Sequence, residues 1–358
     1  MKIDFVINSL IAGGAERVMV LLADHFASKG HDVTIITFNE PEEFKFSDKV
    51  KRVRLHHGKI SNHTIRSIKN LTSYYRHKNN RPNVMIPFMT HGNFIGILVG
   101  RLLGIKVLSS EHNNHLKKTD RIGHITKKYL YRYSNALTVL TSFDVEYYKK
   151  NGAKVYIMPN PCSFNILENR ENPREKVAVA VGNLDRYHHK GFDNLIPLIA
   201  PVLKENPEWR LKIVGAGKDG LIFLTDLAET HGISEQVEFT GFSSNVAGIM
   251  KESEIFILSS RFEGLPMVML EAMSQGLACV SYNCKTGPSD IIQDGVNGLL
   301  VEDQDQEAMA NTLRRVINDG QLRSMLGRQA LRSLERFDMD AIYENYLKIF
   351  KEIGAYSG

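Results

Sequence analysis

Short apolar runs alternate with longer amphipathic stretches along almost the whole chain. The runs are rich in Val, Ile and Phe, as is typical of buried parallel strands, and the stretches between them repeat apolar side chains at helical spacing. We expect strands at residues 2–8, 31–38, 51–55, 83–88, 105–109, 136–140, 155–158, 177–181, 209–214, 237–240, 255–258, 278–282 and 298–301. Strands that alternate with helices in this way indicate an α/β fold with parallel sheets.

The 358 residues are too many for one ordinary core, and the alternation falls into two series. Residues 162–175 separate the series; they are polar, contain proline and show no period, which favours a linker. We therefore predict two doubly wound, Rossmann-like domains that face each other across a cleft, at residues 1–165 and 176–337. The last helix, at about 338–353, is expected to pack back on the first domain.

Composition, with 43% hydrophobic and 24% charged residues, is that of a globular protein. No signal sequence and no apolar run of about 20 residues is visible, so we expect a cytoplasmic protein, peripheral at most on the inner face of the plasma membrane. The cysteines, Cys162, Cys279 and Cys284, are odd in number and lack metal-ligand spacing. We interpret them as small buried side chains.

Charge is distributed unevenly along the chain. Residues 1–165 contain 25 Lys and Arg against 12 Asp and Glu, a net charge of +13, whereas the remainder carries −8. This asymmetry indicates that the first domain meets an anionic partner: nucleic acid, a membrane surface or a phosphorylated substrate. Two basic stretches, residues 63–81 and 117–133, combine lysine and arginine with apolar or tyrosine side chains and favour docking on anionic lipid. Solvated charges on helices that pack against the sheet would produce the same pattern.

A candidate phosphate site follows the strand at 255–258. The chain passes through a loop into a helix expected to run from Pro266 to Gln275 and to end at Gly276. The N-terminus of such a helix presents unpaired N–H groups and the positive end of the helix dipole, which suits a diphosphate. Glu263 lies in the loop and Glu271 in the helix, and a carboxylate is the usual acceptor for ribose hydroxyls.

A second candidate loop, residues 182–191, begins where the strand at 177–181 ends. Arg186 and Lys190 in this loop would neutralise a diphosphate without a metal ion, although a purely solvated loop would look similar. The neighbouring His188 and His189 have no carboxylate or cysteine at ligand spacing, so no metal site is expected.

Two features of the first series are also candidates. Gly13 and Gly14 open a helix and would allow a ligand to approach the backbone, or they only close the turn. His112 follows the strand at 105–109, at the sheet edge where α/β proteins bind ligands, or it only caps a loop.

The segment Glu263–Pro266 with Glu271–Met273 resembles the E-x7-E element of the family 4 retaining glycosyltransferases, which have the GT-B fold. Further segments match over nearly the whole chain: Gly13–Glu16, Glu111-His112, Asn160-Pro161 and Gly295–Leu300. Within the family, the chain resembles bacterial enzymes that extend polyprenyl-diphosphate-linked glycans.

The resemblance implies a role for each matching residue. Catalytic roles fall to His112, Glu263 and Lys190. The implied donor-binding residues are Gly13, Gly14, Arg186, Lys190, Phe242, Glu263, Gly264, Leu265, Met267, Val268 and Glu271. One position departs from the family pattern, because Asn183 stands where the family usually has an arginine, and Arg186 is the candidate to replace that charge.

The resemblance further implies transfer of a hexose or N-acetylhexosamine from a UDP-sugar to a glycan acceptor, lipid-linked, in bacterial surface polysaccharide assembly. It implies no cofactor, no metal and no nucleic acid. The main alternative is a sugar-nucleotide epimerase of GT-B architecture. A nucleic-acid-binding protein would need a recognition motif that the sequence lacks. A dinucleotide-dependent oxidoreductase is disfavoured because the turn at Gly13 is not G-x-G-x-x-G.

Overall fold

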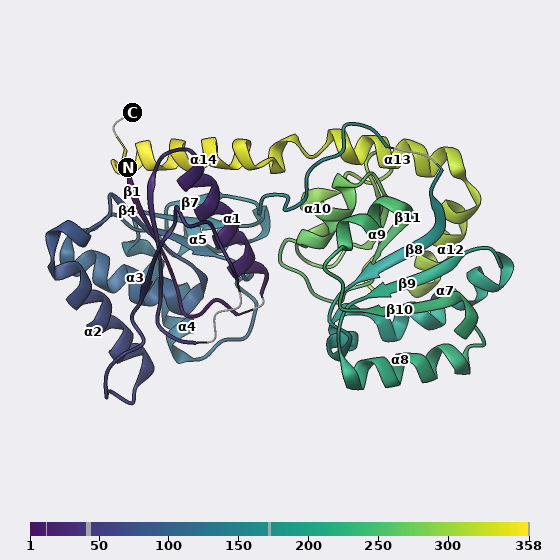
Figure 1. Ribbon diagram of the computed structural model, residues 1–358, viewed down its shortest axis with the longest axis horizontal. Helices are drawn as coiled ribbons and strands as arrows, with labels where there is room; N and C mark the ends of the chain where they lie inside the picture. Colours follow the sequence, from purple (N-terminus) through teal and green to yellow (C-terminus); the bar gives the residue numbers. More distant parts are fainter. Residues whose placement is uncertain (12, 41–43, 171–172, 357–358) are drawn as a thin grey trace. The chain divides into compact units, whose positions relative to one another are not determined.

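The computed structural model describes residues 1–11, 13–40, 44–170 and 173–356 and divides into two compact units (Figure 1). The first unit comprises Met1–Pro161 and Asp338–Gly358, and the second Cys162–Phe337. The stretch expected as a linker, 162–175, therefore belongs to the second unit, apart from residues 171–172, which lie outside the described residues. Residue 12, in the predicted glycine turn, also lies outside them.

The first unit contains parallel strands in the order β3-β2-β1-β4, followed by β5-β6-β7. Two isolated parallel bridges, Met85 to Val107 and Phe88 to Ser110, join β4 to β5. The strands are β1 (Lys2–Ile7), β2 (Asp32–Thr37), β3 (Lys51–Arg54), β4 (Val84–Pro87), β5 (Leu108–Glu111), β6 (Ala136–Val139) and β7 (Val155–Ile157).

Helices cover both faces of this sheet, with α1 against α14 on one face and α2 against α3 on the other (Figure 1). The first pair meets through aromatic side chains, since the ring of Phe26 lies 5.0 Å from that of Tyr343 and 5.9 Å from that of Tyr346. The helices are α1 (Gly14–Ser28), α2 (His63–Arg76), α3 (Met89–Leu103), α4 (Arg121–Ile125), α5 (Val145–Lys150) and α14 (Met339–Glu352), with short 3-10 or π turns at η1 (Lys78–Asn80), η2 (Thr126–Leu130), η3 (Tyr131–Tyr133) and η4 (Ser142–Asp144).

The second unit has one parallel sheet in the order β10-β9-β8-β11-β12-β13. This is the doubly wound order, in which β9 and β10 are added on one side of β8, and β11, β12 and β13 on the other. The strands are β8 (Glu175–Val181), β9 (Arg210–Val214), β10 (Val237–Gly241), β11 (Ser253–Leu258), β12 (Ala278–Tyr282) and β13 (Leu299–Val301). The helices and turns are η5 (Leu184–Arg186), α6 (Tyr187–Lys190), α7 (Phe192–Glu205), α8 (Lys218–Thr230), η6 (Ser234–Gln236), α9 (Val246–Glu252), α10 (Met267–Ser274), α11 (Pro288–Ile291), α12 (Gln306–Asn318), α13 (Gly320–Arg332) and η7 (Glu335–Phe337).

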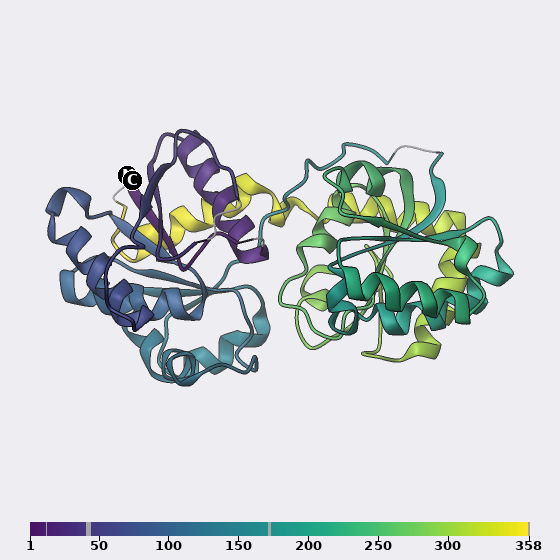
Figure 2. The ribbon, with the colours of Figure 1, turned by 60° about the horizontal axis from the view of Figure 1, so that its bottom comes forward.

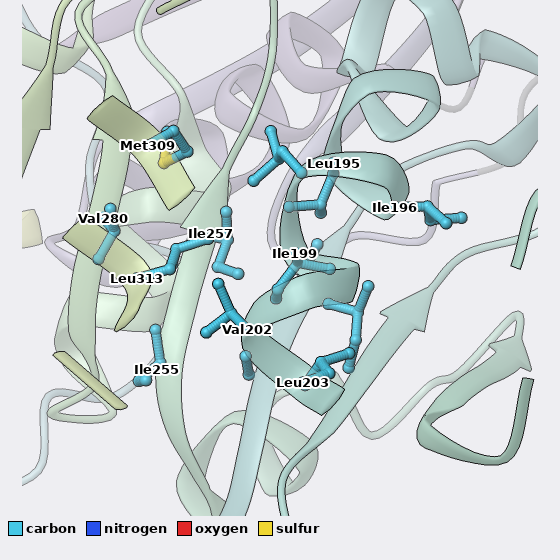
Figure 3. Packing of buried hydrophobic residues seen from close by; sticks show 14 of the residues in the cluster. Leu195, Ile196, Ile199, Val202, Leu203, Ile255, Ile257, Val280, Met309 and Leu313 are labelled. Atoms are coloured by element: carbon cyan, nitrogen blue, oxygen red, sulfur yellow. The ribbon is translucent and has the colours of Figure 1, made fainter. Parts of the chain in front are cut away.

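Helices α7 and α8 lie on one side of this sheet and α9 and α10 on the other (Figure 1); in Figure 2 the α8 side comes forward. The buried core forms where α7 and α12 pack against β11 and β12 (Figure 3). Ile199 and Val202 of α7 lie beside Ile257 of β11, all at most 1% exposed. This packing fixes the strands whose carboxyl ends carry the candidate residues. All three cysteines are buried, as the sequence predicts.

Several elements differ from the sequence predictions near the first unit's site. The strand expected at 105–109 is Leu108–Glu111, because Ser109, Ser110 and Glu111 are buried and hydrogen-bonded rather than exposed. Helix α3 begins at Met89, directly after β4, and α2 covers the basic stretch 63–81 only as far as Arg76. Ile65, one of the apolar side chains of that stretch, is 56% exposed.

Candidate functional site

Two of the predicted residues of the second unit form an ion pair. Lys190 follows the loop after β8 and Glu263 lies in the loop after β11, and these strands are neighbours in the sheet. The Lys190 Nζ lies 2.8 Å from Glu263 Oε1, and the side chains are only 18% and 11% exposed. The sequence prediction that both residues reach one site is consistent with this contact, and each residue here neutralises the other.

The two loops are fastened to each other along their backbones. Ser259 Oγ donates to the Lys190 carbonyl at 2.9 Å, and Arg261 N donates to the His189 carbonyl at 3.0 Å. Gly191 has φ +71°, and a Cβ there would lie 1.9 Å from the Ser259 carbonyl oxygen. Only glycine fits this approach, which fixes the position of Lys190.

Sequence reasoning missed a second ion pair beside this loop. Arg261 Nη1 lies 2.7 Å from Asp193 Oδ1, and the other oxygen of Asp193 lies 2.9 Å from His188 Nδ1. Arg261 also donates to the His188 carbonyl. The only sequence signal was an arginine in the loop three residues after the end of β11. Among the described residues, no cluster of three His, Cys, Asp or Glu side chains could hold a metal ion.

Helix α10 begins one residue later than predicted. Pro266 is the N-cap residue with φ −71° and ψ 101°, and no side chain caps the helix. Met267 and Val268 thus supply the first N–H groups, and the adjoining Gly264 and Leu265 form the approach to the helix. The helix ends at Ser274, before Gly276 in the predicted left-handed conformation (φ +70°).

The remaining donor candidates occupy different environments. Glu271 lies on α10 and is 5% exposed, and Ser163 Oγ donates a hydrogen bond to its carboxylate. Phe242 follows β10 and is 82% exposed. Arg186 is an exposed residue at the end of η5, and Asn183, the departure from the family pattern, caps that turn by accepting from Asp185 N. Asn183 therefore has a structural role in the loop.

In the first unit, His112 directly follows β5, as predicted. Its ring stacks on Phe88 with centroids 4.7 Å apart, and its Nε2 lies 3.0 Å from Ser110 Oγ. Burial lowers the pKa of His112 to about 3. The imidazole is therefore neutral near pH 7. It can donate a hydrogen bond to a hydroxyl or accept one from it, but it carries no extra proton with which to act as a general acid.

Glu111 holds the loop that carries His112, a role that the sequence motif did not reveal. Its buried carboxylate accepts from Thr90 Oγ1 at 2.7 Å, from Tyr131 Oη at 2.5 Å, and from the backbone N of His112 and Asn113 at 3.1 Å each. Four donors around one carboxylate fix the start of this loop.

A cavity of about 330 Å³ opens beside this loop within the first unit. Its polar lining includes Asn8, Ser9, Glu16, His91, Asn113 and Lys117. Gly13 lies at the N-terminus of α1, where a Cβ would come within 2.2 Å of Glu16 Oε2, whereas a Cβ at Gly14 would meet nothing within 4 Å. The contact at Gly13 is with the flexible end of the Glu16 side chain, which could move aside, so neither position requires glycine in this structure.

The stretch 117–133 is not wholly the surface that its composition predicts. Lys127 is 4% exposed, and its Nζ donates to the carbonyls of Asn114, His115 and Lys117 at 3.0, 3.4 and 3.2 Å. Tyr131 is 2% exposed and bonds Glu111. These two residues were expected at a membrane surface; they point inward because the loop carbonyls and the Glu111 carboxylate need donors.

Comparison with known proteins identifies the family. Residues 12–164 match the family described as Glycosyltransferase Family 4, and residues 164–333 match the one described as Glycosyl transferases group 1. The chain is 31% identical over 360 residues to a Campylobacter jejuni GalNAc-alpha-(1->4)-GalNAc-alpha-(1->3)-diNAcBac-PP-undecaprenol alpha-1,4-N-acetyl-D-galactosaminyltransferase, covering 99% of both chains. The chain belongs to the family 4 glycosyltransferases.

One further relative and two solved structures are similar to this glycosyltransferase. The amylovoran biosynthesis glycosyltransferase AmsD of Erwinia amylovora is 28% identical, over 96% of this chain and 97% of AmsD. The lipopolysaccharide outer core galactosyltransferase WaaB is 22% identical, with a TM-score of 0.80 over 98% of this chain and 99% of WaaB. Anabaena HepE, solved in complex with UDP, is 16% identical with a TM-score of 0.78, over 98% of this chain and 100% of HepE. These structures confirm the predicted GT-B fold class.

Proposed function

We propose that this family 4 glycosyltransferase is a retaining, metal-independent enzyme that transfers a hexose or N-acetylhexosamine from a UDP-sugar to a lipid-linked glycan in bacterial surface glycan assembly. The observation that carries the proposal is the Lys190–Glu263 pair, which joins Lys190 at the end of α6, after β8, to Glu263 in the loop between β11 and α10. The Campylobacter relative, whose name specifies an undecaprenol-diphosphate-linked acceptor, and the UDP complex of HepE support the choice of acceptor and donor.

The donor would be bound by both loops. Lys190 would leave Glu263 for the diphosphate, and the N–H groups of Met267 and Val268 would donate to the phosphate oxygens at the positive end of α10. Glu271 would accept from the ribose hydroxyls. The exposed ring of Phe242 would contact the base, and Arg186 would supply the charge that Asn183 lacks.

The chemical step would rely on stabilising the departing nucleoside diphosphate. Negative charge grows on the phosphate as the glycosidic bond breaks, so fixed N–H donors and a lysine lower the barrier. The acceptor hydroxyl would attack from the face that the phosphate leaves, and its proton would pass to the phosphate oxygen. This order retains the anomeric configuration without a protein nucleophile.

Glu263 and His112 would position the transferred sugar. Glu263, once separated from Lys190, would accept hydrogen bonds from sugar hydroxyls near the anomeric carbon. The neutral His112 would exchange hydrogen bonds with another hydroxyl, in keeping with its pKa of about 3. The acceptor glycan would enter the cavity of the first unit, where amide, hydroxyl and lysine side chains match its hydroxyl groups.

Two substitutions test the donor site. Glu271→Ala should raise the KM for the nucleotide sugar about tenfold, since a hydrogen bond to a charged group contributes about 1.5–3 kcal/mol. Lys190→Ala should lower kcat about 100-fold, because it removes charge stabilisation of the leaving group. Initial rates across donor concentrations separate the two effects.

Matched controls are available at the exposed ends of α7 and α8. Lys204→Ala and Glu229→Ala remove the same charges from the C-termini of these helices and should leave both constants unchanged. Unchanged kinetics for both Glu271→Ala and Lys190→Ala would contradict the assignment.

We also propose that the first unit docks on an anionic membrane through an exposed apolar and basic face, defined by Leu98, Arg101, Leu102, Ile125, Lys128, Tyr129, Arg132 and Tyr133. Leu102 is 69% exposed, and Tyr129 and Tyr133 are about half exposed at 49% and 51%. These side chains belong to α3 and to the segment that packs on it. Aromatic and basic side chains together suit a lipid interface. None of the described helices has the length and apolarity to cross a bilayer.

A further inference from the structure

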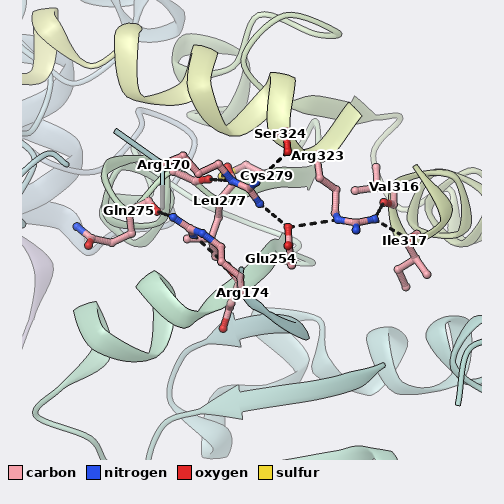
Figure 4. Close-up of polar contacts among 12 residues, drawn as sticks. Arg170, Arg174, Glu254, Gln275, Leu277, Cys279, Val316, Ile317, Arg323 and Ser324 are labelled. Carbon is pink, nitrogen blue, oxygen red and sulfur yellow. Dashed lines mark hydrogen bonds and ion pairs between the residues drawn. The ribbon is translucent and has the colours of Figure 1, made fainter. Parts of the chain in front are cut away.

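The segment that precedes β8 is fastened to the second unit by a buried ion network (Figure 4). We call residues 162–170 and 173–174 the strap. The Arg170 side chain is 2% exposed; its Nε donates to the Gly276 carbonyl at 2.9 Å, and its guanidinium pairs with Glu254. Glu254 also pairs with Arg323, whose Nε lies 3.3 Å away. The Glu254 carboxylate pairs with both guanidinium groups, and backbone carbonyls, among them those of Gly276, Val316 and Ile317, accept further hydrogen bonds from the two arginines.

Further bonds fix the strap to the end of α10. Arg174 donates to the carbonyls of Ser253 at 3.0 Å and Gln275 at 2.7 Å (Figure 4). Leu167 N donates to the Ser274 carbonyl at 3.0 Å. Gln275 in turn donates through Nε2 to the Asn165 carbonyl at 3.0 Å. The strap therefore keeps a fixed position relative to the helix that carries Glu271.

The first residues of the strap reach Glu271 itself. Ser163 Oγ donates to the Glu271 carboxylate, and the neighbouring Cys162 is bonded through its N–H to the Phe337 carbonyl at 2.8 Å. Glu271 is 5% exposed, so its carboxylate has little water to orient it. A hydrogen bond from a fixed hydroxyl restricts the rotation of such a side chain.

We propose that Ser163 is a positioning residue for nucleotide binding. Its hydroxyl holds the Glu271 carboxylate in the orientation that accepts hydrogen bonds from the ribose hydroxyls. Because the carboxylate is already ordered, nucleotide binding costs less side-chain entropy. The inference rests on the proposed role of Glu271. The opposite role is also testable. If the Ser163 hydroxyl competed with the ribose hydroxyls for the Glu271 carboxylate, it would weaken nucleotide binding, and Ser163→Ala would bind the nucleotide more tightly.

The test measures nucleotide affinity in the full-length protein. Calorimetric titration with UDP, GDP and ADP first finds the nucleoside diphosphate that the unsubstituted protein binds. Ser163→Ala should then raise the Kd for that nucleotide about tenfold, and Ser163→Thr, which keeps the hydroxyl, should restore it to within about twofold. Ser333→Ala removes a hydroxyl that bonds the Ala330 carbonyl in the same unit and should leave the Kd unchanged.

A double-substitution cycle distinguishes positioning from a general structural effect. In a Glu271→Ala background, Ser163→Ala should change the Kd by less than about twofold, because its partner is gone. Melting temperatures within about 2 °C of each other would show that Ser163→Ala leaves the fold intact.

Each result has one meaning. If the unsubstituted protein binds none of the three nucleotides, the proposed donor site fails, and the inference fails with it. If it binds one, but Ser163→Ala binds that nucleotide equally well or more tightly, the positioning role alone is overturned. The same holds if the tenfold loss persists in the Glu271→Ala background.

Discussion

Asp4 is a fully buried carboxylate in the first strand of the chain. It lies in β1 with 0% exposure, and its Oδ2 accepts a hydrogen bond from Tyr75 Oη at 2.8 Å. Burial raises the pKa of Asp4 to about 7, against 3.8 when it is unperturbed. The folded protein therefore holds a proton that the unfolded chain releases, and this group destabilises the fold as the pH rises from about 4 to 7.

Replacement of Asp4 by asparagine should remove this dependence. The Asp4 carboxyl alone lowers the free energy of unfolding by about 1.4 kcal/mol per pH unit in that range, whereas an amide does not titrate. Asp4→Asn should thus gain stability relative to the unsubstituted protein on going from pH 5 to pH 8. Urea unfolding of both proteins at the two pH values measures the free energy of unfolding of Asp4→Asn relative to the unsubstituted protein. If this relative free energy is the same at pH 5 and pH 8, the raised pKa of Asp4 is contradicted.

His112 makes the free energy of unfolding depend on pH in the opposite sense to Asp4. The contribution of Asp4 is therefore measured as the difference between the Asp4→Asn variant and the unsubstituted protein. Its pKa is lowered by burial to about 3 from 6.5, so the unfolded chain binds the extra proton between these values. Stability from this group is lost as the pH falls from about 6.5 toward 3. The two slopes offset each other in the unsubstituted protein over part of the range, and Asp4→Asn removes only one of them.

Residue types and spacing were enough to select Lys190, Glu263, Glu271 and His112 as candidates in the sequence. Their contacts were not predictable, because each depends on segments far apart in the chain. Ser163 and Glu271 are separated by 108 positions, and nothing in the local sequence indicates that they meet. Glu111 looked like part of a motif, and two of its four donors, Thr90 and Tyr131, come from other elements.

At the scale of elements, apolar runs predicted the strands well because parallel strands covered on both faces are apolar throughout. The exception is β5, where Ser109 and Ser110 replace apolar residues and bury their hydroxyls in hydrogen bonds. The first turns of α3 show the same feature. Thr90 and Asn93 look like loop residues, but they bond Glu111 and Ser110 inside the unit. Polar residues that satisfy one another when buried cannot be distinguished from surface residues by pattern.

The exposed face of α3 and its neighbouring segment provides a prediction at the same scale. The unsubstituted protein should float with vesicles of anionic phospholipid at low salt. Lys128→Glu with Arg132→Glu should reduce binding at least about 30-fold, since each basic residue near the surface contributes about 1 kcal/mol. Leu102→Ser should weaken it through lost apolar burial.

The control for this experiment lies in the second unit. Ile222 is 64% exposed on α8, and Ile222→Ser should leave flotation unchanged. Absence of the unsubstituted protein from the floating fraction would contradict membrane docking.

For the whole molecule, the sequence predicted two α/β series, and the two compact units each contain one. The described residues of the expected linker belong to the second unit instead. A polar, aperiodic segment has the same sequence pattern whether it is a free linker or is bound to a domain. Arg170 and Arg174 fasten the strap to the second unit through side-chain contacts that the local sequence does not indicate. The polar composition thus indicated that a domain boundary lies near this segment, but the position of the boundary depends on buried ion pairs that the sequence pattern does not show.

Retaining transfer from a nucleotide sugar to a lipid-linked glycan is the central claim for the molecule. The most direct test incubates the full-length protein with a panel of UDP-sugars and polyprenyl-diphosphate-linked acceptors, without added divalent metal and with a chelator. Mass spectrometry should show acceptor heavier by one or more hexose or N-acetylhexosamine units, and proton NMR should show the anomeric configuration of the donor in the new linkage. An inverted anomer, or a modified nucleotide sugar released without any acceptor product, would contradict the account.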